Sequence, residues 1–176
     1  MRLLHLASTT LAFSVLVSAS ASAQISLVEP DRGATAGGVL LTIRGSSFTG
    51  VSTVTVGGRV CPVQGLADDE VQCMLPEGEG TFHDVVMFDA TGGEAHRANA
   101  SFSYEAPTLA AIDPDHGPTR GGTTLTLLGE HFGLAPVPLV DDKPCANVQR
   151  VSHNEVQCDI GEGSGVGLPV SIVVGG

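Results

Sequence analysis

The chain has 176 residues and a formal net charge of −11, with 19 Asp and Glu against 8 Lys and Arg. This acidic balance excludes the basic footprint on which nucleic-acid binding depends. Aromatic residues make up only 4% and Trp is absent, which argues against a broad surface for stacking on sugars.

The first 23 residues have the pattern of a secretory signal peptide. Arg2 supplies a positive charge, residues 11–17 form a short apolar core, and Ala21-Ser22-Ala23 matches the small-x-small cleavage site. The alternative is an uncleaved anchor, but the apolar core is shorter than the roughly 20 residues that a spanning helix needs. We predict cleavage before Gln24 and a secreted or extracellular mature chain, whose net charge goes from −11 to −12 because Arg2 is lost.

Two loops that begin at Glu29 and Asp113 nearly repeat each other, as EPDRGATAGG and DPDHGPTRGG. The match continues at the same offset of 84 residues through the first cysteine of each half. After one inserted residue it continues through the shared segment EVQC at 70–73 and 155–158. A period this long suits a duplicated domain better than a solenoid unit. The sequence therefore predicts two domains, at residues 24–106 and 107–176.

Each half is predicted to be all-β, because short β-branched or alternating runs are separated by Gly and Asp clusters without a helical period. In the first half these runs are residues 39–44, 51–56, 59–63, 70–75, 84–89 and 98–104. The segment Val56-Gly57-Gly58-Arg59 is typical of a two-residue hairpin turn, and Asp141-Asp142 takes that place in the second half. Several short antiparallel strands in about 80 residues predict a small β-sandwich for each half.

The Pro and Gly residues of the repeated loop are predicted to be structural turn residues. Proline cannot donate to a strand ladder and therefore ends the first strand, while the paired glycines let the chain reverse tightly. These residues are Pro30, Gly33, Gly37, Gly38, Pro114, Gly117, Gly121 and Gly122. The alternative is a phosphate-binding loop, which runs into a helix N-terminus and carries a Lys. Here each loop runs into a predicted strand without that Lys.

Four cysteines in a secreted chain allow three pairings. The repeat favours one disulfide within each half, Cys61 with Cys73 and Cys145 with Cys158, because cross-pairing would make the repeated spacing a coincidence. A zinc site is the alternative, but the sequence has neither paired Cys-x-x-Cys motifs nor a Cys/His cluster.

No motif of a hydrolase, metalloprotease or EF-hand is present, so no catalytic, cofactor-binding or metal-binding residue and no enzyme activity are expected. Acidic turns at 68–70, 77–79 and 141–142 leave calcium as an alternative to a solubilising role. Five histidines lie in or beside predicted turns and are expected to be solvated: His83, His96, His116, His131 and His153. Asn99-Ala100-Ser101 is a sequon, which predicts N-glycosylation at Asn99 in a eukaryotic host or else stays silent.

The pattern Pro-x-x-Gly-x-Thr-x-Gly-Gly-x-x-Leu-Thr-x-x-Gly-x-x-Phe, from Pro114 to Phe132, resembles the opening of an IPT/TIG domain. The same opening runs from Pro30 to Phe48, and the first half also has the Gly-Gly hairpin, the segment VQCMLP and the closing Phe102-Ser103-Tyr104. This resemblance implies two tandem immunoglobulin-like β-sandwiches, with Tyr104 in a core position. It also implies a non-enzymatic extracellular or cell-surface module that contacts a protein ligand or receptor partner, as in plexins and fibrocystin-type proteins.

Two further expectations follow from the resemblance. An accessory module of a secreted carbohydrate-active enzyme is the alternative function, whereas the DNA binding of intracellular family members is opposed by the signal peptide and the charge. The second half stops at residues 173–176, where the closing strand of the family begins, so it is expected to lack its last strand. The chain is then expected to be a fragment with further domains or a membrane anchor beyond residue 176, unless a partner chain donates the strand. The short linker Glu105-Ala106-Pro107-Thr108 predicts a semi-rigid rod.

Overall fold

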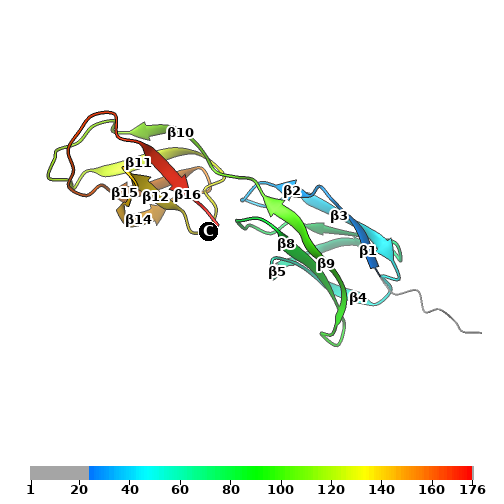
Figure 1. The fold of residues 1–176 in the computed structure, drawn as a ribbon. Coiled ribbons are helices and arrows are strands. Elements are labelled where there is room, and N and C mark those ends of the chain that lie inside the picture. Colours follow the sequence, from blue (N-terminus) through cyan, green and yellow to red (C-terminus); the bar gives the residue numbers. More distant parts are fainter. Residues whose placement is uncertain (1–23, 176) are drawn as a thin grey trace, which may run out of the picture.

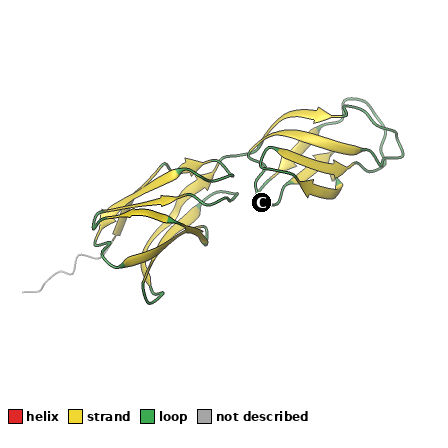
Figure 2. Cartoon of the chain, turned by 180° about the vertical axis from the view of Figure 1, so that it is seen from behind, coloured by secondary structure: helices red, strands yellow, loops and turns green. Residues whose placement is uncertain are grey.

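The computed structural model describes residues 24–175, and in this range the chain forms strands and loops without a helix (Figure 2). Two β units follow one another along an elongated molecule (Figure 1). We call strands β1 to β9 the first unit and strands β10 to β16 the second unit. The predicted signal peptide, residues 1–23, lies outside the described residues.

The strands of the first unit are β1 (Gln24–Glu29), β2 (Arg32–Gly33), β3 (Leu40–Ser46), β4 (Val51–Val56), β5 (Arg59–Cys61), β6 (Val63–Leu66), β7 (Glu70–Met74), β8 (His83–Asp89) and β9 (Glu94–Tyr104). Those of the second unit are β10 (Thr108–Asp113), β11 (Thr124–Glu130), β12 (Val137–Val140), β13 (Lys143–Pro144), β14 (Ala146–Arg150), β15 (Glu155–Asp159) and β16 (Val170–Val173).

The first unit is a sandwich of a four-stranded sheet, in the order β1-β3-β7-β6, and a five-stranded sheet, in the order β2-β9-β8-β4-β5. Strict alternation places one face of each strand inside: in β7, Val71 and Cys73 are fully buried while their neighbours are not. Phe48 and Phe102 are the largest fully buried side chains. Burying each such side chain stabilises the fold by about 2 kcal/mol. The predicted all-β, tandem immunoglobulin-like architecture is confirmed.

The second unit repeats one of these sheets in full and the other in part. Its sheet β10-β11-β15-β14 matches β1-β3-β7-β6, with the same register shift near the start of β10 as in β1. The facing sheet has only the order β13-β12-β16, so no described residues supply counterparts of β2 and β9. Its buried core is correspondingly smaller, and consists of Leu125, Leu127, Phe132, Val156 and Cys158.

The repeated loop has the same geometry in both units, which explains why the sequence contains it twice. Gly37 donates from its N–H to Ala34 and Gly38 donates to Leu75, each at 2.9 Å. Gly121 and Gly122 make the equivalent bonds, and all four glycines have positive φ. The loop is thereby tied to the residue that follows the neighbouring strand of the same sheet, Leu75 after β7 or Ile160 after β15.

Each disulfide is formed within one unit, Cys61 with Cys73 and Cys145 with Cys158, with Cα–Cα distances of 5.4 and 5.6 Å. In the first unit the bond joins β5 of the five-stranded sheet to β7 of the four-stranded sheet. It therefore links the two layers of the sandwich across the core.

Two details of strand β9 differ from the sequence expectations. Strand β9 begins at Glu94, before the predicted start at residue 98, because the hairpin between β8 and β9 needs only residues 90–93. His96 was expected in a solvated turn, but it lies within β9 with only 5% of its surface exposed. Its ring packs edge-on against Phe48, with centroids 5.1 Å apart, because an inward position of a strand faces the core whatever its polarity.

Candidate functional site

The junction between the two units contains the longest-range side-chain hydrogen bonds found among residues 24–175. The first unit contributes the loop after β7 and the repeated loop at Thr35, and the second unit contributes the loops after β11 and β14. The connecting segment, residues 105–107, is only three residues long because β9 ends at Tyr104 and β10 begins at Thr108. Such a short linker holds the two ends of the sandwiches against each other (Figure 1).

Glu79 binds the second unit through its carboxylate. Its Oε2 atom accepts hydrogen bonds from the backbone N–H groups of Leu134, at 2.6 Å, and Ala135, at 2.9 Å. Hydrogen bonds to an ionised acceptor are stronger than neutral ones, and two successive N–H groups form a small anion-binding concavity. Glu79 therefore fixes the position of the second unit relative to the first.

His153 makes a second bridge across the junction. Its Nδ1 atom lies 2.9 Å from Oγ1 of Thr35, and its Nε2 atom lies 3.3 Å from Oε2 of Glu77. Arg150 adds an ion pair with the same carboxylate at 3.7 Å. The side chain of His153 is only 13% exposed, whereas the sequence predicted a solvated turn residue. That prediction is wrong because the neighbouring unit covers the turn.

Two glycines allow the backbones of the two units to meet. A Cβ atom on Gly175 would lie 2.5 Å from Cα of Gly80, and a Cβ atom on Gly133 would collide with the side chains of Glu79 and Val174. Both glycines have positive φ, a conformation that other residues adopt only with strain. The junction thus combines close backbone packing with charged hydrogen bonds.

A cavity of about 170 Å³ opens at this junction, lined by Val56, Gly57, Arg59, Gly78, Glu79, His83, Tyr104 and Leu134. The hydroxyl of Tyr104 donates to the carbonyl of Pro76 at 3.0 Å, and burial raises the pKa of this phenol to about 12. The His83 ring stands edge-on to Tyr104, with centroids 5.4 Å apart. Nε2 of His83 lies 2.7 Å from the carbonyl of Glu79, so this nitrogen carries the proton and donates it.

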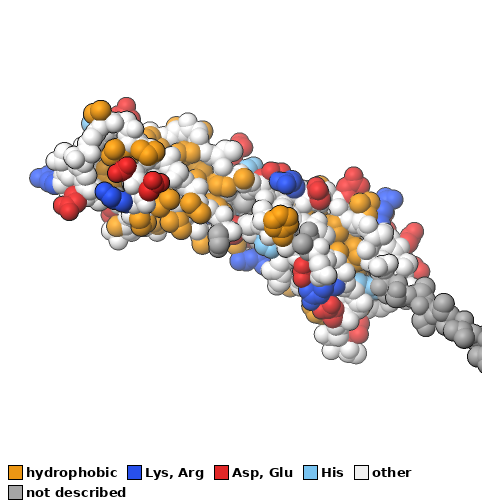
Figure 3. All heavy atoms as spheres, in the orientation of Figure 1, with side chains coloured by type: hydrophobic (Ala, Val, Ile, Leu, Met, Phe, Trp, Pro, Cys, Tyr) orange, Lys and Arg blue, Asp and Glu red, His pale blue; other side chains and the backbone are white. Residues whose placement is uncertain are grey.

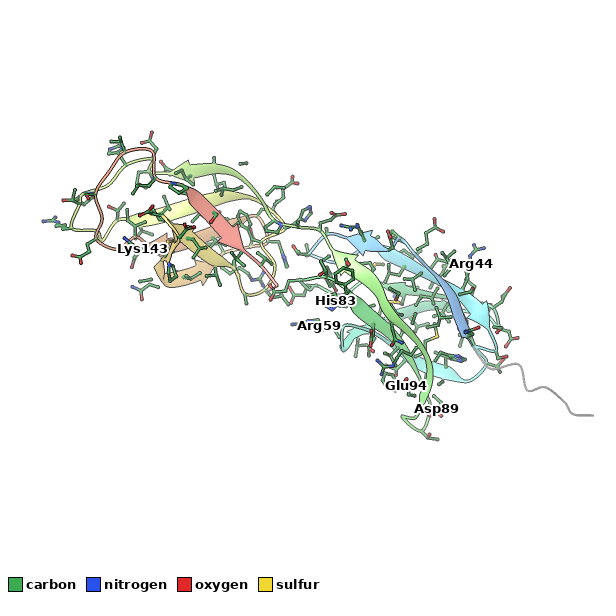
Figure 4. All side chains as sticks on the ribbon, in the orientation of Figure 1. Arg44, Arg59, His83, Asp89, Glu94 and Lys143 are labelled. Carbon is green, nitrogen blue, oxygen red and sulfur yellow. A yellow bond between two sulfur atoms is a disulfide. The ribbon has the colours of Figure 1, made fainter. Side chains whose placement is uncertain are left out.

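Two exposed side chains lie at the same end of the first unit as the cavity. Phe82, which directly precedes β8, is 74% exposed and has a φ of 60°. Arg59 is exposed in the neighbouring hairpin strand and lines the cavity, and it takes part in none of the ion pairs found among residues 24–175. Figure 4 shows Arg59 and His83 together at the end of the first unit that faces the second. We call Arg59, Phe82 and His83 the junction face.

The residues singled out in the sequence are placed differently. Asn99 is exposed on β9, where a glycan would meet solvent, and its glycosylation stays a prediction. In the acidic turn at 77–79, Glu77 and Glu79 contact the second unit, while Asp68 accepts a hydrogen bond from Thr49. Within residues 24–175 no three or more His, Cys, Asp or Glu side chains converge as metal ligands, and no helix there is long and apolar enough to span a membrane.

The residues of the junction escaped sequence reasoning for an identifiable reason. The sequence emphasises what the two halves share, whereas the junction uses positions at which they differ. At the offset of 85 residues, Glu79 corresponds to Ser164 and His153 corresponds to Asp68. The one available signal was the short Pro-containing linker, which predicts that the two ends are held close together.

Comparison with known proteins shows what the chain is similar to. The model of the IPT/TIG domain matches twice, at residues 23–104 and 107–176. Mouse plexin-B2 is 29% identical over 144 residues, which are 77% of this chain and 7% of plexin-B2. Mouse fibrocystin-L is 31% identical over 159 residues, which are 86% of this chain and 4% of fibrocystin-L. The chain therefore spans only a small part of the curated relatives that it matches.

Among solved structures, the extracellular region of plexin A4 aligns with 96% of this chain and 19% of its own length, at 23% identity and a TM-score of 0.42. The surface glycan-binding protein PbSGBP-B of Prevotella bryantii aligns with 78% of this chain and 34% of its own, at 10% identity and a TM-score of 0.53, which shows a shared fold. Since the family model covers nearly all of the described residues, the chain belongs to the IPT/TIG domain family and contains two tandem copies of that domain.

Proposed function

We propose that this chain is a non-enzymatic extracellular interaction module that binds a protein partner through the junction face. The observation that carries the proposal is the combination of a fixed junction with two exposed side chains, Phe82 and Arg59, at the end of the first unit that meets the second. Large aromatic residues and Arg dominate the energy of protein interfaces, because they bury much area or make several hydrogen bonds. The contacts of Glu79 and His153 hold the second unit in one position next to these side chains, which lowers the entropy cost of binding a partner that touches both units.

Several features support an extracellular location. Both units contain a disulfide, which persists in oxidising compartments. The sequence begins with a predicted signal peptide, and one solved structure with a similar chain is described as a plexin extracellular region. We propose that the chain is cleaved before Gln24 and is located outside the cell or on its outer face.

The second candidate is a glycan-binding accessory module, and one observation favours it: Phe82 is an exposed aromatic residue on which a sugar ring can stack. The shared fold with a surface glycan-binding protein is compatible with this role. Of the other aromatic side chains described, Phe48, Phe102, Phe132 and Tyr104 are buried in the two cores and Phe88 is half-buried. A single stacking residue offers little area for an oligosaccharide, so we rank protein binding first.

The two candidates are separated by the same variants in two screens. The secreted chain, multimerised for avidity, is tested against an array of individually displayed extracellular proteins and against a glycan array. We expect a protein ligand whose binding falls at least about tenfold in Phe82→Ser and in Arg59→Glu. Val148→Ser, which changes another exposed apolar side chain on β14, serves as the control and keeps full binding. A glycan that requires Phe82, with no protein ligand, would reject the proposal in favour of the second candidate.

A further inference from the structure

The two units carry a cation at the same position of the same hairpin. Arg59 of the first unit corresponds to Lys143 of the second, because each follows the two-residue turn and pairs with the last residue of the preceding strand. Lys143 forms an ion pair with Asp141, the first residue of its turn, at 3.9 Å. In the first unit Gly57 takes the place of this aspartate. The first unit therefore has the cation without the partner that the second unit provides.

Within residues 24–175, no other carboxylate replaces that partner. Arg59 takes part in none of the ion pairs of this range. Two acidic side chains of the junction are engaged with the second unit instead. Glu77 contacts Arg150 and His153, and Oε2 of Glu79 accepts from two backbone N–H groups. Although acidic residues outnumber basic ones in the chain, Arg59 is left available to a carboxylate from outside.

The cavity at the junction places Arg59 beside aromatic rings. Burial raises the pKa of Tyr104, and the positive charge of Arg59 opposes this shift, which puts the guanidinium close to the phenol. Two glycines make room for the rings: a Cβ atom on Gly57 would lie 2.6 Å from Nδ1 of His83, and one on Gly78 would collide with the ring of Tyr104. Figure 3 shows blue and pale blue side chains together at the surface between the two units, where Figure 4 labels Arg59 and His83.

The size of the cavity indicates what kind of group fits it. Pockets that hold a drug-sized molecule have volumes of about 300–1,000 Å³, whereas this cavity has about 170 Å³. It suits one side chain of a partner better than a free oligosaccharide or cofactor. The guanidinium of Arg is planar and matches a carboxylate through two parallel hydrogen bonds. The complementary group is therefore the side chain of an Asp or a Glu.

We propose that the junction cavity receives an Asp or Glu side chain of the partner protein, whose carboxylate pairs with Arg59 as Asp141 pairs with Lys143. This inference rests on the proposed function and deepens it by naming the group that the partner presents. Phe82 directly precedes His83 of the cavity wall, so an apolar residue of the partner near that carboxylate adds contact area. The net charge of −11 repels a strongly acidic surface, so the partner presents this carboxylate within a neutral or basic surface.

The probe is propionate, which has the carboxylate of a Glu side chain, and propionamide is its neutral counterpart of the same shape. Each is titrated into the isotope-labelled mature chain at constant ionic strength, and NMR follows the Nε–H signal of Arg59 and the amide of Gly57. We expect saturable shifts with propionate, with a dissociation constant on the order of millimolar because one exposed ion pair contributes little, and none with propionamide. Arg59→Gln should abolish the shifts. Lys143→Gln makes the same change where the cation is already paired with Asp141, and should leave them intact.

Gly57 offers a second test, which separates charge from shape. Gly57→Asp gives the first unit the carboxylate that the second unit has, and Gly57→Asn places a neutral side chain of the same size against His83. Because Arg59 then pairs with the new aspartate, propionate should bind at least about threefold more weakly to Gly57→Asp than to Gly57→Asn. A protein ligand from the array screen should show the same order of affinity.

Several results would overturn the inference. Absence of saturable shifts would do so, and so would equal shifts with propionamide, because the cavity would then select for shape alone. Binding that survives Arg59→Gln would place the carboxylate elsewhere, and equal binding by Gly57→Asp and Gly57→Asn would show that charge at this hairpin has no effect. A protein ligand that depends on Phe82 but tolerates Arg59→Gln would reject the carboxylate and leave the proposed function intact. Propionate binding without any protein ligand would reject the proposed function, and with it the partner, and leave only a site for small carboxylates.

Discussion

Gly37 and Gly38 of the repeated loop have similar φ angles but different surroundings. Replacing each of them by Ala therefore separates the effect of conformation from the effect of close packing. Both have positive φ, 70° for Gly37 and 76° for Gly38. A Cβ atom on Gly37 would lie 2.6 Å from the carbonyl oxygen of Leu75, whereas one on Gly38 would meet nothing within 4 Å. Only Gly37 is therefore required both for its conformation and for the close approach of two backbones.

We predict that Gly38→Ala lowers the free energy of unfolding by about 1 kcal/mol, the cost of the left-handed conformation. Gly37→Ala is expected to lower it by roughly 2 to 4 kcal/mol, since the collision adds to that cost. Urea denaturation of both variants measures the difference. Equal losses would show that the loop moves away from Leu75 without cost, contrary to the geometry.

Tyr104 gives a second test, because it is the single Tyr of the chain and no Trp is present. Burial raises the pKa of its phenol to about 12, above the ordinary value near 10. A group whose pKa is raised on folding contributes stability that is complete below the unfolded pKa. This contribution is lost as pH rises through the folded value.

The expected result is an unfolding free energy that falls by up to about 2 kcal/mol between pH 10 and pH 12. Phenolate absorbance of the folded chain should rise near pH 12 and report Tyr104 alone. The variant Tyr104→Phe should lose this pH dependence, and at neutral pH it should be less stable by about 1 kcal/mol because the hydrogen bond to Pro76 is gone. Ionisation near pH 10 in the folded chain would contradict the buried position.

At the scale of elements, each disulfide closes a short loop within one sandwich, with sequence separations of 12 and 13 residues. Closing loops of this size stabilises a domain by about 3 kcal/mol in the chain-entropy model. We predict that the double variant Cys61→Ala with Cys73→Ala loses about this amount, and that Cys145→Ala with Cys158→Ala loses a similar amount. Calorimetry under oxidising conditions measures both, and a loss confined to one pair would show that the two loops are not equivalent.

The elements also show how far the sequence predicted the fold. Every residue of the run Val51–Val56 except Ser52 is β-branched, which favours a strand, and β4 has the predicted bounds. The Gly57-Gly58 turn and its counterpart Asp141-Asp142 all have positive φ, as a primed hairpin turn requires. The start of β9 was missed because Glu94, His96 and Arg97 are polar residues, and their positions depend on pairing with β8 rather than on local preference.

The candidate site was less predictable than the fold, for a physical reason. Strand periodicity and turn glycines are local signals, whereas the junction depends on contacts between residues far apart in the sequence, such as Glu79 with Leu134. Phe82 has no sequence signal of its own, because exposure of a single aromatic residue follows from the tertiary fold. Its positive φ likewise became visible only in the structure.

At the scale of the whole molecule, the arrangement of the two units depends on Glu79, whose carboxylate accepts from two backbone N–H groups of the second unit. A hydrogen bond to a charged group contributes about 2 kcal/mol. In Glu79→Ala the amides of Leu134 and Ala135 should therefore exchange with solvent about 30-fold faster, because opening of the junction costs less. The freed units should also show a wider range of orientations in small-angle X-ray scattering.

Two further variants separate the junction from a general loss of stability. Glu79→Gln keeps an acceptor oxygen and should restore part of the amide protection. Glu94→Ala removes a more exposed carboxylate, which pairs with Arg97 and lies away from the second unit, and it should leave the junction amides unchanged (Figure 4). The opposite result is exchange of the junction amides in Glu79→Ala at the rate of the unaltered chain. That result would show that the close packing of Gly80 against Gly175 and the bridge through His153 are enough to hold the two units together. In that case the partner protein should bind the junction face equally well after the loss of Glu79. If the carboxylate does hold the junction, Glu79→Ala should weaken binding of the partner, because the two units are no longer fixed relative to each other.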